Sequence, residues 1–201
     1  MDHPRRPPYG GRLYICMKED RFIAGIDYSL CGPAICISDM SKAFSFDACE
    51  FYFLTNTKKY ARNIKKNIHG EIFSPFDEEM ERYETIADWA EEKVVGCCYI
   101  GLEGYAYNAT GKVFHIAENT GVLKYKIYQR SIPLEVITPS RIKKFATQKG
   151  NASKDLMYEK FLDETNVPLK QFFGMEGDVK SPLSDIVDAY YICKYMRYNV
   201  I

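Results

Sequence analysis

The 201-residue sequence has no apolar run approaching the roughly 18 to 20 residues that a membrane-spanning helix needs. Its first residues, Met1–Arg6, lack the apolar centre of a signal peptide. Seven cysteines are present, but no two have the Cys-x-x-Cys spacing of a structural zinc site. We therefore expect no membrane partner, no disulfide framework, and an intracellular, cytoplasmic protein with free thiols.

A net charge is also absent, because 27 basic residues balance 27 acidic ones. The charges are unevenly distributed along the chain. Residues 112–160 contain ten Lys or Arg and four acids, whereas residues 71–103 contain ten acids and two basic residues. Residues 58–66 contain five Lys or Arg and no acid. This asymmetry is typical either of a phosphate-binding face opposite a solvated acidic face or simply of exposed helix faces.

The length favours one domain. Residues 1–20 are rich in Pro, Arg and Gly and are expected to form a flexible tail, and residues 21–201 are expected to form the domain. Hydrophobic residues make up 46% of the chain, which suffices for one core.

Apolar runs and turn residues predict an α/β protein. The expected strands are Phe22–Ser29, Ala34–Ser38, Phe44–Leu54, Cys97–Glu103 and Leu134–Ile137. The expected helices are Asp77–Val95, Val113–Arg130, one opened by Pro139 behind Thr138, Lys154–Glu164 behind the N-cap Ser153, and one from Ser181-Pro182 to about Tyr198. The element order predicts a mixed sheet that begins with three antiparallel strands, continues with parallel strands and is flanked by helices.

Four acids fall where carboxylates are costly. Asp27 and Glu103 end apolar strands, and Asp185 and Asp188 share one face of the last helix. Converging carboxylates without His or Cys favour Mg²⁺, with Mn²⁺ as a substitute. Two ions about 3.5–4 Å apart would suit hydrolysis of a phosphodiester. Any single one of these acids could instead cap a helix or face water.

Four stretches carry a family resemblance. They are Gly25–Ser29, Leu102–Ala106, Thr138–Lys154 and Ser184–Ala189. Together they resemble the RuvC-type Holliday-junction resolvases of the RNase H-like, or retroviral-integrase, superfamily, in the form carried by some phages and bacteria. The resemblance covers residue 21 to the C-terminus.

The resemblance implies an RNase H-like fold and a crossover junction endodeoxyribonuclease that resolves four-way DNA junctions by paired symmetric nicks. It also implies a homodimer and a bacterial or phage-infected host cell. The catalytic residues that it implies are Asp27, Glu103, Asp185 and Asp188, which bind metal, and Lys149 at the edge of the active site. Phage-like members usually show Gly-Lys-Gly after Ala-Thr, and here Gln148 replaces the first glycine.

Several residues are candidates for DNA contacts. Basic side chains near the acids are expected to hold phosphates: Lys112, Arg141, Lys143, Lys144, Lys149 and Lys154. Tyr105 and Tyr107 could stack on an unpaired base at the branch point, or could pack against helix 113–130. His69 and His115 are expected to have surface or helix-packing roles, without a carboxylate at helical spacing.

Helix 113–130 is the candidate dimer contact. Its proposed stripe contains Val113, Ile116, Ala117, Thr120, Gly121, Lys124 and Ile127. The competing interpretation is that this stripe packs onto the sheet.

Three other functions remain open at this point. One is a relaxed nuclease for forks, flaps and three-way branches, and another is a non-catalytic nucleic-acid-binding module on the same fold. A third, an actin-like ATPase or sugar kinase, would need a second Gly-rich phosphate hairpin that the sequence lacks.

Overall fold

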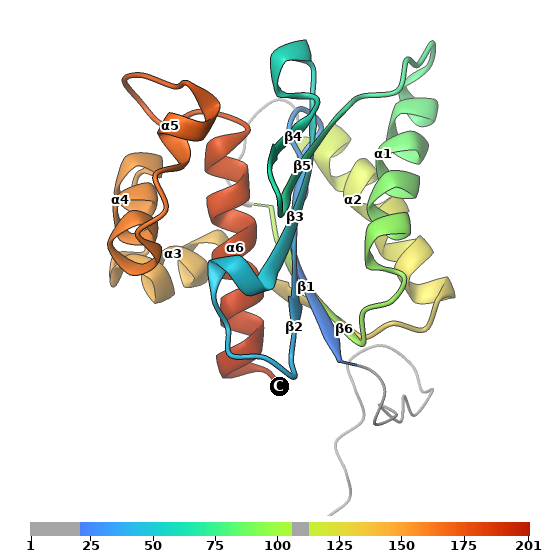
Figure 1. Ribbon diagram of the computed structural model, residues 1–201. Helices are drawn as coiled ribbons and strands as arrows, with labels where there is room; N and C mark the ends of the chain where they lie inside the picture. The colour runs from blue at the N-terminus through green and yellow to red at the C-terminus, as the bar shows by residue number, and fades with distance from the viewer. Residues whose placement is uncertain (1–20, 106–112) are drawn as a thin grey trace, which may run out of the picture.

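The computed structural model describes residues 21–105 and 113–201. The expected tail, residues 1–20, lies outside them. Within the described residues the chain forms one seven-stranded sheet with helices on both faces (Figure 1). The strands are β1 (Phe22–Asp27), β2 (Ala34–Asp39), β3 (Cys49–Thr55), β4 (Asn63–Lys65), β5 (Ile68–Ile72), β6 (Tyr99–Glu103) and β7 (Leu134–Ile137). The helices are α1 (Glu79–Val94), α2 (Val113–Gln129), α3 (Pro139–Thr147), α4 (Lys154–Thr165), α5 (Leu169–Phe173) and α6 (Leu183–Asn199), with 3-10 helices η1 (Phe46–Ala48) and η2 (Lys58–Tyr60).

The sheet has the strand order β4-β5-β3-β2-β1-β6-β7. Strands β1, β2 and β3 form antiparallel pairs, and β6 and β7 extend the sheet parallel to β1. The predicted mixed sheet with an antiparallel start is confirmed. The β4–β5 hairpin and the short helix α5 were not predicted; β5 pairs parallel to β3, and β4 forms the edge.

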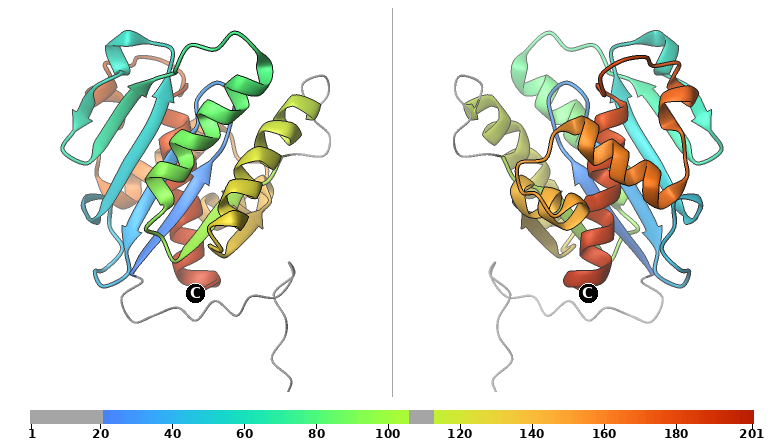
Figure 2. Two further views of the ribbon diagram at one scale, coloured as in Figure 1. Left: turned by 90° about the vertical axis from the view of Figure 1, so that its right-hand side faces the viewer. Right: turned by 90° about the vertical axis from the view of Figure 1, so that its left-hand side faces the viewer.

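Helices α1 and α2 cover one face of the sheet, whereas α3 to α6 cover the other (Figures 1 and 2). Strand β1 is buried on both faces: Ile23 belongs to the core under α6, and Ala24 and Ile26 belong to the core under α1 and α2. This arrangement explains the nearly continuous apolar pattern of β1. No helix in the described part of the chain is long and apolar enough to cross a bilayer.

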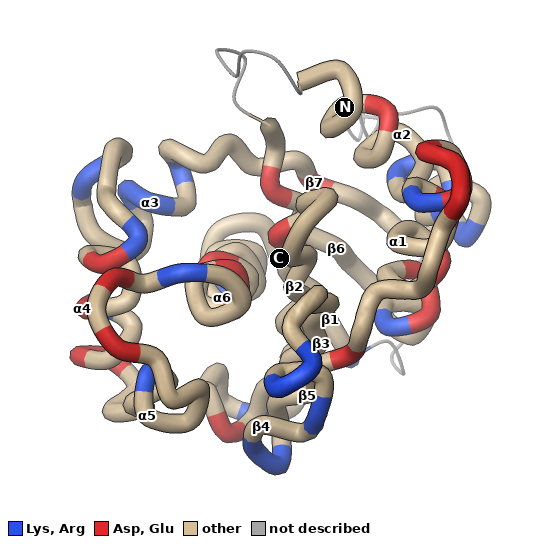
Figure 3. The backbone as a smooth tube through the Cα atoms, turned by 90° about the horizontal axis from the view of Figure 1, so that it is seen from above, with Lys and Arg blue, Asp and Glu red and all other residues tan. Residues whose placement is uncertain are grey.

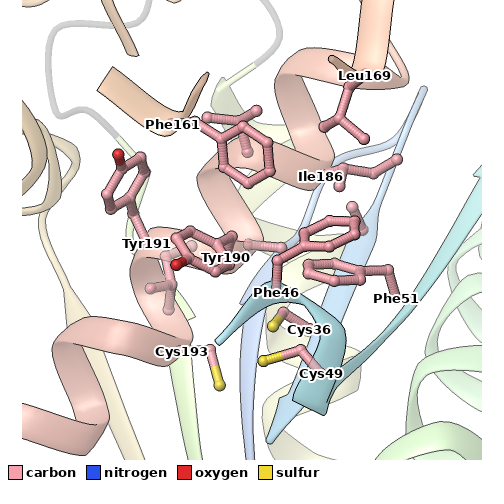
Figure 4. Packing of buried hydrophobic residues seen from close by; sticks show 14 of the residues in the cluster. Cys36, Phe46, Cys49, Phe51, Phe161, Leu169, Ile186, Tyr190, Tyr191 and Cys193 are labelled. Carbon is pink, nitrogen blue, oxygen red and sulfur yellow. The ribbon is translucent and has the colours of Figure 1, made fainter. Parts of the chain in front are cut away.

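The core under α6 is rich in aromatic rings (Figure 4). Tyr190 lies edge-on to Phe161, with ring centroids 5.1 Å apart, and Phe46 stacks on Phe51 at 5.0 Å. Buried thiols line the same core, among them Cys36, Cys49 and Cys193. Free thiols are what the cysteine spacing predicted.

The third strand begins later than predicted. Residues 46–48 form η1 and β3 starts at Cys49, so the predicted strand Phe44–Leu54 is wrong over its first five residues. Phe46 is buried because η1 inserts its ring into the core. An aromatic residue in a buried turn produces the same sequence pattern as one in a strand.

Helix α6 lies directly on β1 and β6 because both strands carry a glycine beneath it. A Cβ atom on Gly25 would lie 2.2 Å from the backbone nitrogen of Cys193, and one on Gly101 would lie 2.4 Å from Cγ of Met196. A larger residue at Gly25 would push the helix backbone away from the sheet, and one at Gly101 would displace the side chain of Met196. We call Gly25 and Gly101 the glycine seat.

The glycine seat yields a stability prediction. Gly25→Ala should lower the free energy of unfolding by about 1–3 kcal/mol or more, because the new methyl group overlaps backbone atoms. Gly96→Ala is the matched control, since no atom lies within 4 Å of a Cβ there. Thermal unfolding should show a Tm several degrees lower for Gly25→Ala only. Equal Tm values for the two variants would contradict the close seating of α6.

Candidate active site

Asp27 and Glu103 end two neighbouring parallel strands. In the β1–β6 pairing Ile26 lies opposite Leu102, so the two acids that follow emerge side by side at one edge of the sheet. Side chains alternate between faces along a strand, and each acid comes two residues after a member of the glycine seat. Both carboxylates therefore point to the face that α6 covers.

Helix α6 brings two more carboxylates to the same place. Above the glycine seat the helix contacts β1 through Ala189 and β6 through Ile192. Asp185 and Asp188 each precede one of these residues by four positions, which is about one helical turn. They consequently extend beyond the seat toward the ends of β1 and β6.

Electrostatics show that the four acids lie within reach of one another. The pKa of Asp27 is raised well above its usual value, first by burial and then by Glu103, Asp185 and Asp188. Burial followed by the charge of Asp188 raises the pKa of Glu103 to about 8. The pKa of Asp188 is raised to about 7 by burial and by Asp185. The structure thus gathers all four predicted acids in one partly buried cluster, although their roles stay predictions.

Two lysines oppose this accumulation of negative charge. The charges of Lys143 and Lys154 both lower the pKa of Glu103 and of Asp188, against the effect of burial. Lys154 Nζ donates to Ser184 Oγ at 3.1 Å. The sequence suggested both lysines as phosphate contacts, and the structure places their charges beside the acids themselves.

Two serine side chains hold the carboxylate of Asp185. Its Oδ2 accepts a hydrogen bond from Ser181, and its Oδ1 accepts one from Ser184 Oγ at 2.7 Å. A Cβ atom on Gly32 would lie 2.6 Å from Oδ2, so the turn between β1 and β2 closes against this carboxylate. The sequence analysis missed both serines, although each lies within four residues of Asp185.

Lys149 is exposed in the turn after α3. Gln148, which precedes it, has a φ of 65° and donates its N–H to the carbonyl of Lys144 at 2.8 Å. Thr147 Oγ1 accepts the N–H of Lys149 at 3.1 Å. Glycine suits this left-handed conformation. Gln148 adopts it nonetheless, at a cost of roughly 1–2 kcal/mol.

The other candidate DNA contacts are only partly described. Arg141 and Lys144 are exposed on α3. Tyr105 lies just beyond β6 and is 37% exposed, and Lys124 Nζ of α2 lies over its ring, 6.0 Å from the centroid. Two further candidates, Tyr107 and Lys112, lie outside the described residues.

The chemistry of the cluster fits a hard divalent cation. All four side chains are carboxylates, the donors that Mg²⁺ and Mn²⁺ prefer. Burial and the neighbouring negative charges raise the pKa values of Asp27, Glu103 and Asp188, and a bound cation would relieve the repulsion. The four acids are not drawn together as closely as the ligands of a bound metal. Among the described residues, three potential ligand atoms lie within 4.8 Å of one another in another group of side chains.

That group is Glu79, His115 and Glu118, on the α1–α2 face of the sheet. His115 Nδ1 lies 2.6 Å from Glu79 Oε1 and 3.9 Å from Glu118 Oε2, and the hydroxyl of Tyr83 lies 3.0 Å from Nδ1. The expectation that His115 lacks a carboxylate at helical spacing was wrong, because Glu118 is three residues away. His69 also has a carboxylate partner, Glu50, on a neighbouring strand.

No family model and no curated protein matches the chain. Solved structures do match it. Thermus thermophilus RuvC aligns with a TM-score of 0.54 at 15% identity over 87% of this chain and 94% of that one. The same protein in complex with a Holliday junction substrate gives a TM-score of 0.58 at 16% identity over 88% and 95%. The chain has a RuvC-type fold. A third match, the yeast mitochondrial Holliday junction resolvase Ydc2, has a TM-score of 0.49 at 17% identity over 89% and 80%.

The RuvC-type likeness establishes the fold that the sequence resemblance implied. At 15–16% identity this likeness establishes the arrangement of strands and helices, and it does not establish the roles of individual side chains. Those roles have to be argued from the acids and lysines of this chain.

The raised pKa values predict how the stability of the metal-free protein depends on pH. Glu103 and Asp188 bind protons more tightly in the folded than in the unfolded chain. Their unfavourable contribution is therefore absent below the unfolded pKa values, grows above them, and is complete once the pH has passed about 7 for Asp188 and about 8 for Glu103. In EDTA, Tm should fall as the pH is raised from about 4, the ordinary carboxyl pKa, to about 8.

Asp188→Asn should weaken the dependence of Tm on pH in EDTA and raise Tm at alkaline pH, because it removes one of the repelling charges. The control is Asp47→Asn, since the side chain of Asp47 is 81% exposed. A Tm that rises with pH in EDTA, or a drop in alkaline Tm for Asp188→Asn, would show that the acids do not repel one another as inferred.

Proposed function

We propose that this protein is a divalent-metal-dependent endonuclease that cuts branched DNA, with the four-way junction as its substrate. The observation that carries the proposal is the meeting of four carboxylates from β1, β6 and α6 in one partly buried cluster with two lysines beside them. The RuvC-type fold supports it, and a RuvC of this fold has been solved in complex with a Holliday junction substrate.

In this proposal Asp27, Glu103, Asp185 and Asp188 hold two Mg²⁺ ions. When bound, such ions activate the attacking water and stabilise the departing oxygen of the phosphodiester. The serines on Asp185 hold one carboxylate in place, so its oxygens do not have to reorient during hydrolysis.

In this proposal the lysines bind phosphate groups of the DNA. Lys143 and Lys154 lie close enough to the acids to influence their pKa values, and we assign them to the oxygens of the scissile phosphate. Lys149 is exposed at the end of α3 and joins them at the edge of the site. Arg141 and Lys144 are assigned to neighbouring phosphates, which position the DNA without reading its sequence.

The first test is mutation of a metal-binding acid. Asp27→Asn should reduce cleavage of a four-way junction more than about 100-fold, because loss of a ligand should exceed the effect typical of second-layer partners. Junction binding in EDTA should remain, because the basic side chains are untouched. Asp47→Asn is the control and should cut normally. Cleavage by Asp27→Asn at the wild-type rate would refute the assignment.

A substrate panel separates the remaining alternatives. Four-way junctions, forks, flaps, three-way branches and linear duplex should be incubated with Mg²⁺. Paired symmetric nicks in the four-way junction are expected. Equal cutting of all branched forms would indicate a relaxed branch nuclease, and binding without cutting would indicate a non-catalytic module.

The proposed enzyme acts as a homodimer, since two sites related by a dyad match the near two-fold symmetry of a junction. The predicted contact stripe on α2 is only partly accessible in the monomer. Thr120 and Ile127 are buried, because that side of α2 packs toward α1 and the sheet, whereas Gly121 is exposed. The opposite side of α2 carries the exposed aromatics Phe114 (75%), Tyr125 (61%) and Tyr128 (65%).

We assign the dimer contact to this exposed aromatic side. Wild-type protein should sediment as a dimer at micromolar concentration, and Tyr125→Arg/Tyr128→Arg should sediment as a monomer, because like charges would face each other across the dyad. Tyr198→Arg is the control, since Tyr198 is an exposed tyrosine on α6. A double variant that remains dimeric would place the contact elsewhere.

A further inference from the structure

A second basic surface lies at the β4 edge of the sheet. It consists of Lys58, Lys59, Arg62 and Lys66, which we call the η2 surface, and all four side chains are exposed. None of them forms an ion pair with an acid among the described residues. Lys65, in the same segment, is paired with Asp47 at 3.2 Å and is left out for that reason.

The register of the sheet places the η2 surface level with the acids. Asp27 pairs with Ala34, Ala34 with Phe53, and Phe53 with Gly70. The N–H of Gly70 donates to the carbonyl of Arg62 at 3.0 Å. With strands about 4.8 Å apart, this row of four residues spans about 14 Å.

The η2 surface also lies on the same face of the sheet as the acids. A Cβ atom on Gly70 would meet the carbonyl of Tyr60, and the ring of Tyr60 packs edge-on against Phe173, with centroids 5.4 Å apart. Tyr60 and Phe173 both belong to the core under α6. The acids on β1, β6 and α6 face that same layer.

Basic side chains consequently flank the acids on two sides. Viewed from above, α6 lies between the basic residues of α3 on one side and those near β3, β4 and β5 on the other (Figure 3). A polyanion that crosses the acids is repelled there unless cations are bound. It gains phosphate contacts on both sides of the cluster.

We propose that the η2 surface binds the phosphate backbone of a duplex arm of the DNA substrate, on the side of the acids opposite α3. This inference rests on the proposed function and extends it to the path of one arm. At about 3.4 Å per nucleotide along a strand, 14 Å of sheet corresponds to roughly four nucleotides from the phosphate that is cut. Side-chain reach extends this to about six.

Protection of the sheet edge is an alternative reason for lysines in this segment, because charges on an edge strand discourage pairing with other chains. It accounts for Lys65 on β4 and for Lys66 directly after it. It does not account for Lys58 and Lys59, which lie in η2 before the strand begins. Adjacent like charges without acidic partners repel each other, and an anionic partner offsets that repulsion.

The experiment compares two variants that each remove two positive charges. Lys58→Ala/Lys59→Ala changes the η2 surface. Lys42→Ala/Lys160→Ala is the control, because Lys42 follows the end of β2 that is remote from Asp27 and Lys160 is paired with Asp163 at 2.8 Å. Binding to a four-way junction is measured in EDTA over a series of salt concentrations.

For the η2 variant we expect the slope of log affinity against log salt to fall by about 1.8, which corresponds to two lost phosphate contacts. Affinity near 0.1 M salt should fall about tenfold or more. The control should keep the wild-type slope and affinity. An η2 variant that behaves like the control overturns the inference.

Neutral methylphosphonate linkages locate the contact. Placed four to six nucleotides from the scissile phosphate on the predicted arm, they should weaken binding of the wild type but cause little further loss in the η2 variant. Equal losses in both proteins would place these phosphates elsewhere and overturn the inference.

Failure of the proposed function would look different. In that case the wild type itself would bind four-way junctions no better than linear duplex, and the inference would fall with it. If the wild type prefers junctions and only the η2 result is negative, the proposed function stands and the arm follows another path.

Discussion

Helix α6 packs closely on β1 and β6, and the position of the acidic cluster depends on this contact. At Gly25 the helix backbone itself approaches the strand, and at Gly101 the side chain of Met196 fills the space that a larger residue would need. One helical turn closer to its N-terminus, the helix carries Asp185 and Asp188 to the place where the two strands end. A helix held away by even one methyl group at each strand would carry its carboxylates away from Asp27 and Glu103.

The cluster that results opposes folding when no cation is bound. Burial is the largest cause of the raised pKa values, and the neighbouring carboxylates add to it. Lys143 and Lys154 offset part of this repulsion from α3 and from the start of α4. The cluster is thus kept at a cost in stability, which is common where a protein binds charged ligands.

The fold places the acidic and the basic blocks of the sequence on different faces of the sheet. The acids of residues 71–103 lie largely on α1, and two basic residues pair with them: Lys126 of α2 with Asp88 at 2.6 Å, and Arg130, directly after α2, with Glu91. The basic residues of α3 and the start of α4 lie on the other face of the sheet (Figure 1), where Lys143 and Lys154 act on the acidic cluster. Exposed helix faces therefore explain the acidic block, and a phosphate-binding role for the basic block stays a proposal.

From the sequence alone, the main strands and helices, the mixed sheet and the four acids were identified, because each has a local signal. Apolar runs mark β1 and β6, Pro139 marks the start of α3, and Ser153 caps α4 by accepting the N–H of Leu156. The β4–β5 hairpin gave no such signal, because its short strands are only partly buried.

Only the tertiary structure decided which side chains meet. It brought Lys143 and Lys154 to the acids and held Asp185 with two serines. It also buried Thr120 and Ile127 of the predicted stripe of α2, and it aligned the η2 surface with Asp27 across four strands. These relationships join residues far apart in the chain, and they follow from strand register and from the seating of helices on the sheet. Neither of these is encoded in local periodicity or composition.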